Sequence, residues 1–104
     1  MTMARVKDPD AIELFGVDFG ARLMANRLGV AAITSHQVLP VANPDGSMLT
    51  VEATARNGAE VTARLGGGAA GQTYWVIFEL RLGSSDVLGP IIWPHTIRIR
   101  VAQQ

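Results

Sequence analysis

The chain has 104 residues, of which 48% are hydrophobic and 17% charged, and this predicts one folded domain over residues 1–104 with its own core. Nine basic residues balance nine acidic ones, so the positive surplus with which proteins bind nucleic acids or anionic lipids is missing. Without cysteine the chain forms neither disulfide bonds nor thiolate metal sites, and no apolar run approaches the roughly 18 residues of a membrane span.

The first 24 residues give weak signals. Residues 1–10 are expected to be an extended N-terminal segment, because the residue before a proline, here Asp8, disfavours helix. Between residues 11 and 24 the apolar spacing is partly helical, but two glycines interrupt it. We expect a short extended segment and a turn there, with a helical turn over residues 21–27 as the competing interpretation.

The next segments resemble strands. Residues 30–39 are rich in β-branched side chains and predict a strand that ends at Pro40. A strong turn signal follows over residues 43–46. Residues 48–55 then alternate between apolar and polar side chains, which predicts a strand before a turn at residues 56–58. Its apolar face would hold Leu49, Val51, Ala53 and Ala55.

The second half predicts three more strands. Residues 60–65 and 72–82 flank a glycine-rich loop, and because both faces of the latter segment are apolar, we expect a central strand with Trp75 buried. After a turn over residues 83–86, residues 96–101 predict the last strand. Short strands with turns about every eight to twelve residues predict an all-β fold, an immunoglobulin-like antiparallel β-sandwich.

The glycine-rich loop contains a literal GxGxxG. In dinucleotide-binding proteins this motif lies between a strand and a helix, and the pyrophosphate sits at the helix N-terminus. Here a strand pattern follows instead, and the only lysine, Lys7, is far away in the sequence. We therefore expect no cofactor and a purely structural turn, formed by Gly66, Gly67, Gly68 and Gly71.

No group of residues predicts catalysis or a metal site. Ser35 and His36 are adjacent, but neighbours on a strand point to opposite faces and cannot form a nucleophile–base pair. The acidic residues Asp8, Asp10 and Glu13 lack the spacing and the glycine of a calcium loop. We predict that the protein is not an enzyme and has no catalytic residue and no metal ligand.

A candidate interface lies near the C-terminus. Ile91, Ile92 and Trp93 stand between two prolines in an expected loop, and an exposed apolar loop of this kind marks an interface. Arg98 and Arg100 are expected on the outer face of the last strand, where they could dock against carboxylates of a neighbouring copy. Residues 1–20 carry a net charge of 2 − 4 = −2 and residues 81–104 a net charge of 3 − 1 = +2, which favours head-to-tail contacts.

Several short motifs, taken in order, make the chain resemble a known family. Lys-Asp-Pro stands at residues 7–9, and Asp18-Phe19 takes the place of an Asp-Trp pair. The terminal Ile-x-Ile-x-Val lies within residues 97–101, after an insertion at residues 86–95. A Leu-Ser-Gly-Gly-Thr-Ala-Gly segment leading to Tyr is matched at Leu65, Gly67, Gly68, Ala70, Gly71 and Tyr74. The chain thus resembles the small fiber-tail adaptor proteins of phages and prophages.

This resemblance implies a non-enzymatic structural component of a tailed-phage or prophage virion, made in the cytoplasm of the bacterial host. It implies contacts with other phage tail or connector proteins, with a homo-oligomer as a further expectation. The alternative from the residues alone is a monomeric β-sandwich that binds a ligand such as a carbohydrate. That alternative uses Trp93 as an exposed aromatic platform.

Overall fold

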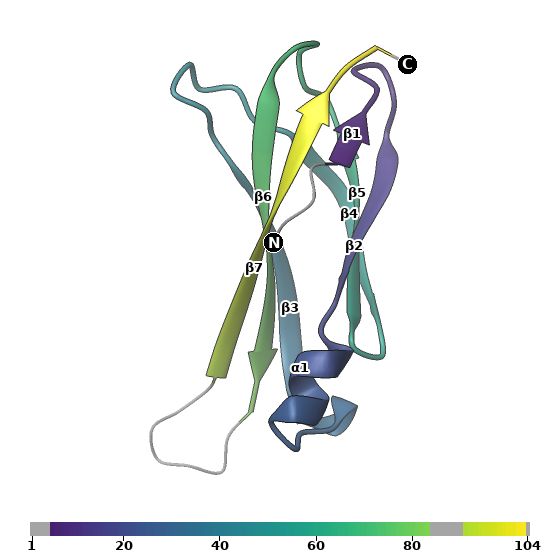
Figure 1. Cartoon of the computed structure of the whole chain (residues 1–104), viewed down its shortest axis with the longest axis vertical. Helices are drawn as coiled ribbons and strands as arrows, with labels where there is room; N and C mark the ends of the chain where they lie inside the picture. The colour runs from purple at the N-terminus through teal and green to yellow at the C-terminus, as the bar shows by residue number, and fades with distance from the viewer. Residues whose placement is uncertain (1–4, 84–90, 104) are drawn as a thin grey trace.

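A computed structural model describes residues 5–83 and 91–103 of the chain. Within these residues two sheets pack face to face, a four-stranded sheet in the order β1-β7-β6-β3 and a three-stranded sheet in the order β2-β5-β4 (Figure 1). The strands are Arg5–Lys7 (β1), Glu13–Asp18 (β2), Ile33–Val41 (β3), Thr50–Asn57 (β4), Glu60–Gly66 (β5), Thr73–Leu82 (β6) and Ile91–Val101 (β7). The all-β sandwich is confirmed, while its immunoglobulin-like character stays a prediction.

The core lies between the sheets and follows from the alternation of side chains along each strand. One face of β6 is buried along its whole length, and β7 adds three residues that are at most 1% exposed. Each such aliphatic side chain contributes roughly 1.5–3 kcal/mol when it leaves water. The β6 and β7 members of the core are Tyr74, Val76, Phe78, Leu80, Leu82, Trp93, Ile97, Ile99 and Val101.

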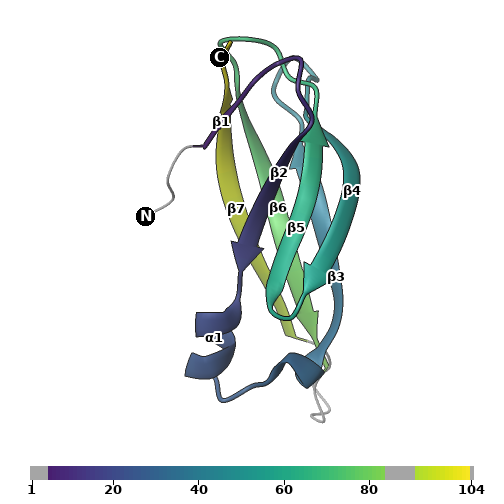
Figure 2. The same cartoon turned by 90° about the vertical axis from the view of Figure 1, so that its right-hand side faces the viewer.

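The N-terminal half contains both of the structures considered for residues 11–24. β2 is the extended segment, and the six-residue helix α1 (Gly20–Ala25) follows it at the lower end of the sandwich (Figure 2). Leu23 is the buried residue of α1 and packs into the core. The helix ends where Arg27 adopts φ 56° and the amide of Leu28 donates to the Leu23 carbonyl at 2.9 Å, a hydrogen bond typical of helix C-termini.

The predicted boundaries of two strands were wrong. The strand expected over residues 30–39 is preceded by a 3-10 turn, η1 (Val30–Ala32), and β3 continues through Pro40 to Val41. Pro40 fits because β3 is an edge strand, bonded to β6 on one side only, so the amide hydrogen that proline lacks is not required. β4 begins at Thr50 and ends at Asn57, two residues later than predicted at each end.

A β-bulge overturns the predicted face of β4. The pairing with β5 shifts between Val51 and Ala53, so that Val51 lies opposite Leu65 and Ala53 opposite Arg64. The extra residue turns the following side chains over. Ala53 and Ala55 are consequently exposed on the outer face and do not share the face of Val51.

The C-terminal strand is longer than predicted. β7 begins at Ile91, so the loop expected at Ile91, Ile92 and Trp93 is wrong, while residues 84–90 lie outside the described residues. Pro94 is tolerated because β1 pairs only with residues 99–101 of β7, which leaves the edge beside Pro94 open. β1 runs parallel to β7, so the four-stranded sheet is mixed and not wholly antiparallel as predicted.

The turn signal over residues 43–46 is confirmed. The amide of Gly46 donates to the Asn43 carbonyl at 2.8 Å, which closes the turn. The hydroxyl of Ser47 donates to Asp45 Oδ1 at 2.6 Å and its amide to the same oxygen at 2.9 Å. These two hydrogen bonds lower the pKa of Asp45 below its ordinary value.

Candidate functional site

Three of the motifs found in the sequence meet at the upper end of the sandwich, where β1, the β5–β6 loop and the end of β7 converge (Figure 1). β1 brings Lys7 into register with Val101, and the amide of Ala102 donates to the Lys7 carbonyl at 2.9 Å. The glycine-rich loop joins them because the Gly71 amide donates to the Val101 carbonyl at 2.8 Å. We call this cluster the motif junction; it consists of Lys7, Gly67, Gly68, Ala69, Tyr74 and Val101.

Lys7 is the buried cation of the motif junction. Its side chain is fully buried, and its Nζ donates to the carbonyl oxygens of Gly67 and Asp8, each at 2.8 Å. A buried ammonium group is costly unless its hydrogens find acceptors. The two carbonyls supply them, and Lys7 thereby ties the start of the chain to a loop 60 residues away.

Gly68 is the point of closest packing in the motif junction. Its φ is +95°, and a Cβ placed there would lie 2.7 Å from Val101 Cγ2 and 3.0 Å from Leu49 Cδ2. Only glycine combines this backbone conformation with so little space. The next amide, that of Ala69, donates to the hydroxyl oxygen of Tyr74 at 3.0 Å, and Tyr74 is 1% exposed.

The geometry of the motif junction differs from that of a phosphate-binding loop. β6 follows the glycine-rich loop directly, so no helix N-terminus faces it. Lys7 is close to the loop, which the sequence did not suggest, but its Nζ is buried and bound to loop carbonyls. The prediction of a structural turn is therefore consistent with the geometry, in which Gly66 ends β5 and the other three glycines have positive φ.

The residues considered for catalysis are kept apart or serve the backbone. On β3, Ser35 lies opposite Arg81 and His36 opposite Leu80, so the two side chains point to opposite faces. In the N-terminal acidic cluster the Asp8 amide donates to Glu13 Oε2 and the Asp10 amide to Asp8 Oδ1, both at 2.9 Å. Among residues 5–83 and 91–103, no group of three His, Asp or Glu side chains could hold a metal ion, and no helix is long and apolar enough to cross a membrane.

The five candidate interface residues divide between the two sides of the four-stranded sheet. Arg98, Arg100 and Ile92 are exposed on its outer face, as predicted for the arginines. Trp93 points the other way and is only 6% exposed, and the guanidinium carbon of Arg22 lies 4.3 Å from its ring centroid. Ile91 shares the side of Trp93 but is 40% exposed at the start of β7.

The predicted exposure of the two tryptophans was the reverse of what the structure shows. Trp75, expected to be buried, is 41% exposed on the outer face, with the Arg98 guanidinium carbon 5.9 Å from its ring centroid. A signal for this was present, because Glu79 and Arg81 share the alternation of Trp75 along β6 and mark that face as the solvent side. For Trp93, the prolines on both sides concealed a strand.

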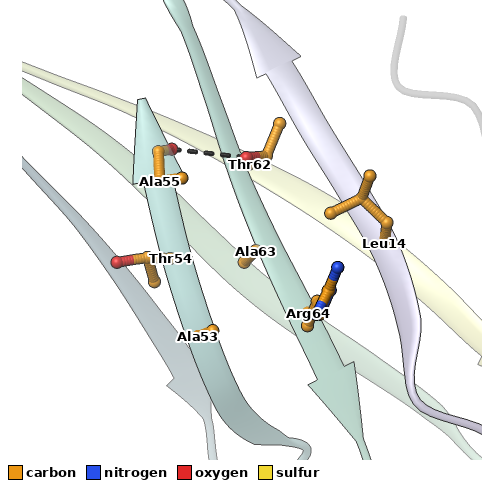
Figure 3. Close-up of a pocket in the computed structure, with 7 residues that line it drawn as sticks. All are labelled: Leu14, Ala53, Thr54, Ala55, Thr62, Ala63 and Arg64. Atoms are coloured by element: carbon orange, nitrogen blue, oxygen red, sulfur yellow. Dashed lines mark hydrogen bonds between the residues drawn. The ribbon is translucent and has the colours of Figure 1, made fainter. Parts of the chain in front are cut away.

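The outer face of the three-stranded sheet is hollowed. A depression of about 190 Å³ opens over β4 and β5 beside Leu14 of β2 (Figure 3). Most of its lining side chains are small, and the Thr62 hydroxyl donates to the Ala55 carbonyl at 3.4 Å within it. The lining residues are Leu14, Ala53, Thr54, Ala55, Thr62, Ala63 and Arg64.

One family model matches the chain, that of the podophage GP4 fiber-tail adaptor protein gp77, over residues 7–88. The match begins at the buried Lys7 and includes the whole glycine-rich loop, whereas it ends before β7. No curated protein and no solved structure matches the chain. Because the model covers well over half of the 104 residues, the chain belongs to the podophage GP4 fiber-tail adaptor family and has the structural role of a tail-fibre adaptor.

Proposed function

We propose that the protein is a non-enzymatic connector in a tailed-phage or prophage virion, made in the cytoplasm of the bacterial host, which joins tail and fibre parts through protein–protein contacts. The observation that carries this proposal is the family match over residues 7–88. Two polar groups of the matched region support the non-enzymatic part of the proposal. Lys7 Nζ and the Tyr74 hydroxyl are both hydrogen-bonded to backbone groups of the fold.

The surface supports contacts with partner proteins. Trp75 is exposed beside the arginines of β7 on the outer face of the four-stranded sheet. Tryptophan and arginine are the residue types most enriched at the energetic centres of interfaces. We assign this face to protein–protein contacts within the virion, with Ile92, Arg98 and Arg100 retained as interface residues.

The ligand-binding alternative lacks the exposed platform that was expected for it. It relied on Trp93 as an exposed platform, and the ring of Trp93 is buried and covered by Arg22. Nothing observed in residues 5–83 and 91–103 favours a sugar site over a protein contact at Trp75.

The decisive experiment removes the gene from the phage or inducible prophage that encodes it. We expect mass spectrometry of purified wild-type virions to detect the protein, and electron microscopy of the deletion to show particles that lack fibres. Expression of the wild-type chain in trans restores the fibres. Deletion particles with a full set of fibres would overturn the proposal.

A further inference from the structure

We propose that one partner of this protein is a second copy of itself, bound head to tail. The outer face of the four-stranded sheet of one copy, the basic face, contacts the outer face of the three-stranded sheet of the next, the acidic face. Self-association of this kind rests on the proposed function, because it assigns a partner to the surface described there. Four observations lead to it.

The first observation is an apolar block at the centre of the basic face. β3 and β6 are neighbours, with Leu39 opposite Ile77 and Val41 opposite Trp75. These four side chains therefore occupy two successive rows on two adjacent strands and are contiguous. Leu39 is 37% and Trp75 41% exposed, so the block protrudes into solvent where a monomer normally places polar groups.

The second observation is the charge around this block. The outer face of the sheet carries Arg81, Arg98 and Arg100 against Glu79, a net charge of 3 − 1 = +2. Glu79 is already bound by Arg81 at 3.0 Å. Arg98 and Arg100 therefore remain to attract carboxylates of a partner, and two basic faces would repel each other.

The third observation is that the acidic face has the opposite charge and shape. Asp18, Glu52 and Glu60 against Arg64 give it a net charge of 1 − 3 = −2. Glu52 belongs to this face because its Oε1 lies 3.0 Å from where an outward Cβ on Gly66 would stand. The hollow over Ala53 and Ala55 lies in the same sheet and offers a recess for the protruding block (Figure 3).

The fourth observation is an unfavourable pair within the monomer. Asp18 and Glu60 lie directly opposite each other in the β2–β5 ladder, and both are exposed. Like charges in this position destabilise a sheet. An arginine from the basic face of a second copy would relieve the repulsion, so association would stabilise the protein at this place.

The geometry of the two faces determines the kind of assembly. They lie on opposite sides of one sandwich, so each contact leaves a basic face free at one end and an acidic face free at the other. Such heterologous contacts build rings or open chains, not closed dimers. A standard interface of about 800 Å² per partner would use roughly an eighth of the 6395 Å² surface of the chain.

The first test is the mass of the purified chain by sedimentation velocity, from micromolar to millimolar concentration and at low and high salt. We expect mass to rise with concentration and to fall as salt screens the charged faces. A monomer at every concentration and at low salt would overturn self-association. An oligomer that does not respond to salt would overturn the pairing of these two faces.

The second test separates the two faces. Trp75→Asp blocks the basic face and Ala55→Arg blocks the acidic face; each variant alone should be monomeric, with self-association weakened by about 30-fold or more. Mixed together, they should form a heterodimer and nothing larger, because each retains one intact face. Met24→Ala, at a residue 79% exposed on α1, is the control and should associate as the wild type does.

A charge exchange distinguishes the loss of an intermolecular contact from misfolding of a variant. Arg98→Glu and Glu60→Arg should each weaken association, and the two changes in one chain should restore part of it. Circular dichroism and thermal unfolding of every variant establish that the sandwich is intact. Folded variants that associate normally, or a mixture of the two blocked variants that stays monomeric, would overturn the proposal. A monomeric chain whose deletion still removes fibres would leave the proposed function standing.

Discussion

The two ends of the sandwich are held by different interactions. At the upper end the motif junction buries a charged amine and a phenol hydroxyl against backbone groups. At the lower end α1 closes the core through Leu23, and the Arg22 guanidinium covers Trp93 at the surface. A buried polar group that loses its partner costs the full desolvation energy. Removing an apolar contact or a surface cation–π contact costs only the free energy of the buried apolar area or of that one electrostatic interaction. Substitutions should therefore be costlier at the upper end.

We expect the largest loss of stability from Gly68→Ala. The new Cβ would lie 2.7 Å from Val101 Cγ2 in a backbone with φ +95°, and we expect a loss of about 3 kcal/mol or more in the free energy of unfolding. Gly71→Ala is the matched control, since Gly71 has φ +86° but no atom within 4 Å of the added Cβ. It should cost about 1 kcal/mol from backbone strain alone. Equal losses in urea unfolding would show that packing at Gly68 is unimportant.

Lys7→Met should have the next largest effect. It keeps most of the apolar stem but leaves the carbonyls of Gly67 and Asp8 without the Nζ donor, which should cost about 1–3 kcal/mol. Chemical denaturation measures the change. Val6→Met, at the neighbouring residue that is 47% exposed, should be close to neutral. A Lys7→Met protein as stable as the wild type would mean that the buried amine does not hold β1 in place.

Tyr74→Phe isolates one hydrogen bond of the motif junction. It removes the hydroxyl that accepts from the Ala69 amide and keeps the buried ring, so we expect a loss of about 1 kcal/mol. Hydrogen exchange of the Ala69 amide should accelerate in the same variant. An unchanged exchange rate would contradict the assigned acceptor.

Arg27→Gly should give the smallest effect and the opposite sign. Arg27 has φ 56° at the end of α1, where glycine avoids the strain of a Cβ. We expect a gain of about 0.5 kcal/mol in the free energy of unfolding, the strain relief being partly offset by the greater freedom of glycine when unfolded. Arg27→Ala keeps the Cβ and should give no gain. A gain from both would assign the effect to the lost charge instead.

Alternation and composition along the chain were enough to predict the central strands and the sandwich. The segments expected at residues 60–65 and 72–82 became β5 and β6 almost unchanged. Other features depend on pairing partners that no local pattern reveals. The bulge after Val51 moved the alanines of β4 to the outer face, and the prolines of β3 and β7 are tolerated only because those segments lie at sheet edges.

The site was predictable in its parts and not in its assembly. Lys7 and the glycine-rich loop each carried a signal, but their 2.8 Å contact exists only because β1 pairs with β7 and brings them together. The exposure of Trp75 depends on which face of β6 the second sheet covers. One face of β6 is buried and the other holds Glu79 and Arg81. The positions of these two charged residues, and not the hydrophobicity of the strand, therefore indicated which face is exposed to solvent.

The parallel pairing of β1 with β7 also sets a time order for folding. Arg5 lies opposite Ile99, a separation of 99 − 5 = 94 residues. The entropy lost in closing so long a loop must be overcome before the contact stabilises the protein. The hairpins β4–β5 and β6–β7 can form earlier from nearer segments. During synthesis β1 therefore waits, unpaired, until Val101 has left the ribosome. A ribosome that stalls within β7 would leave the only lysine of the chain without its place in the core.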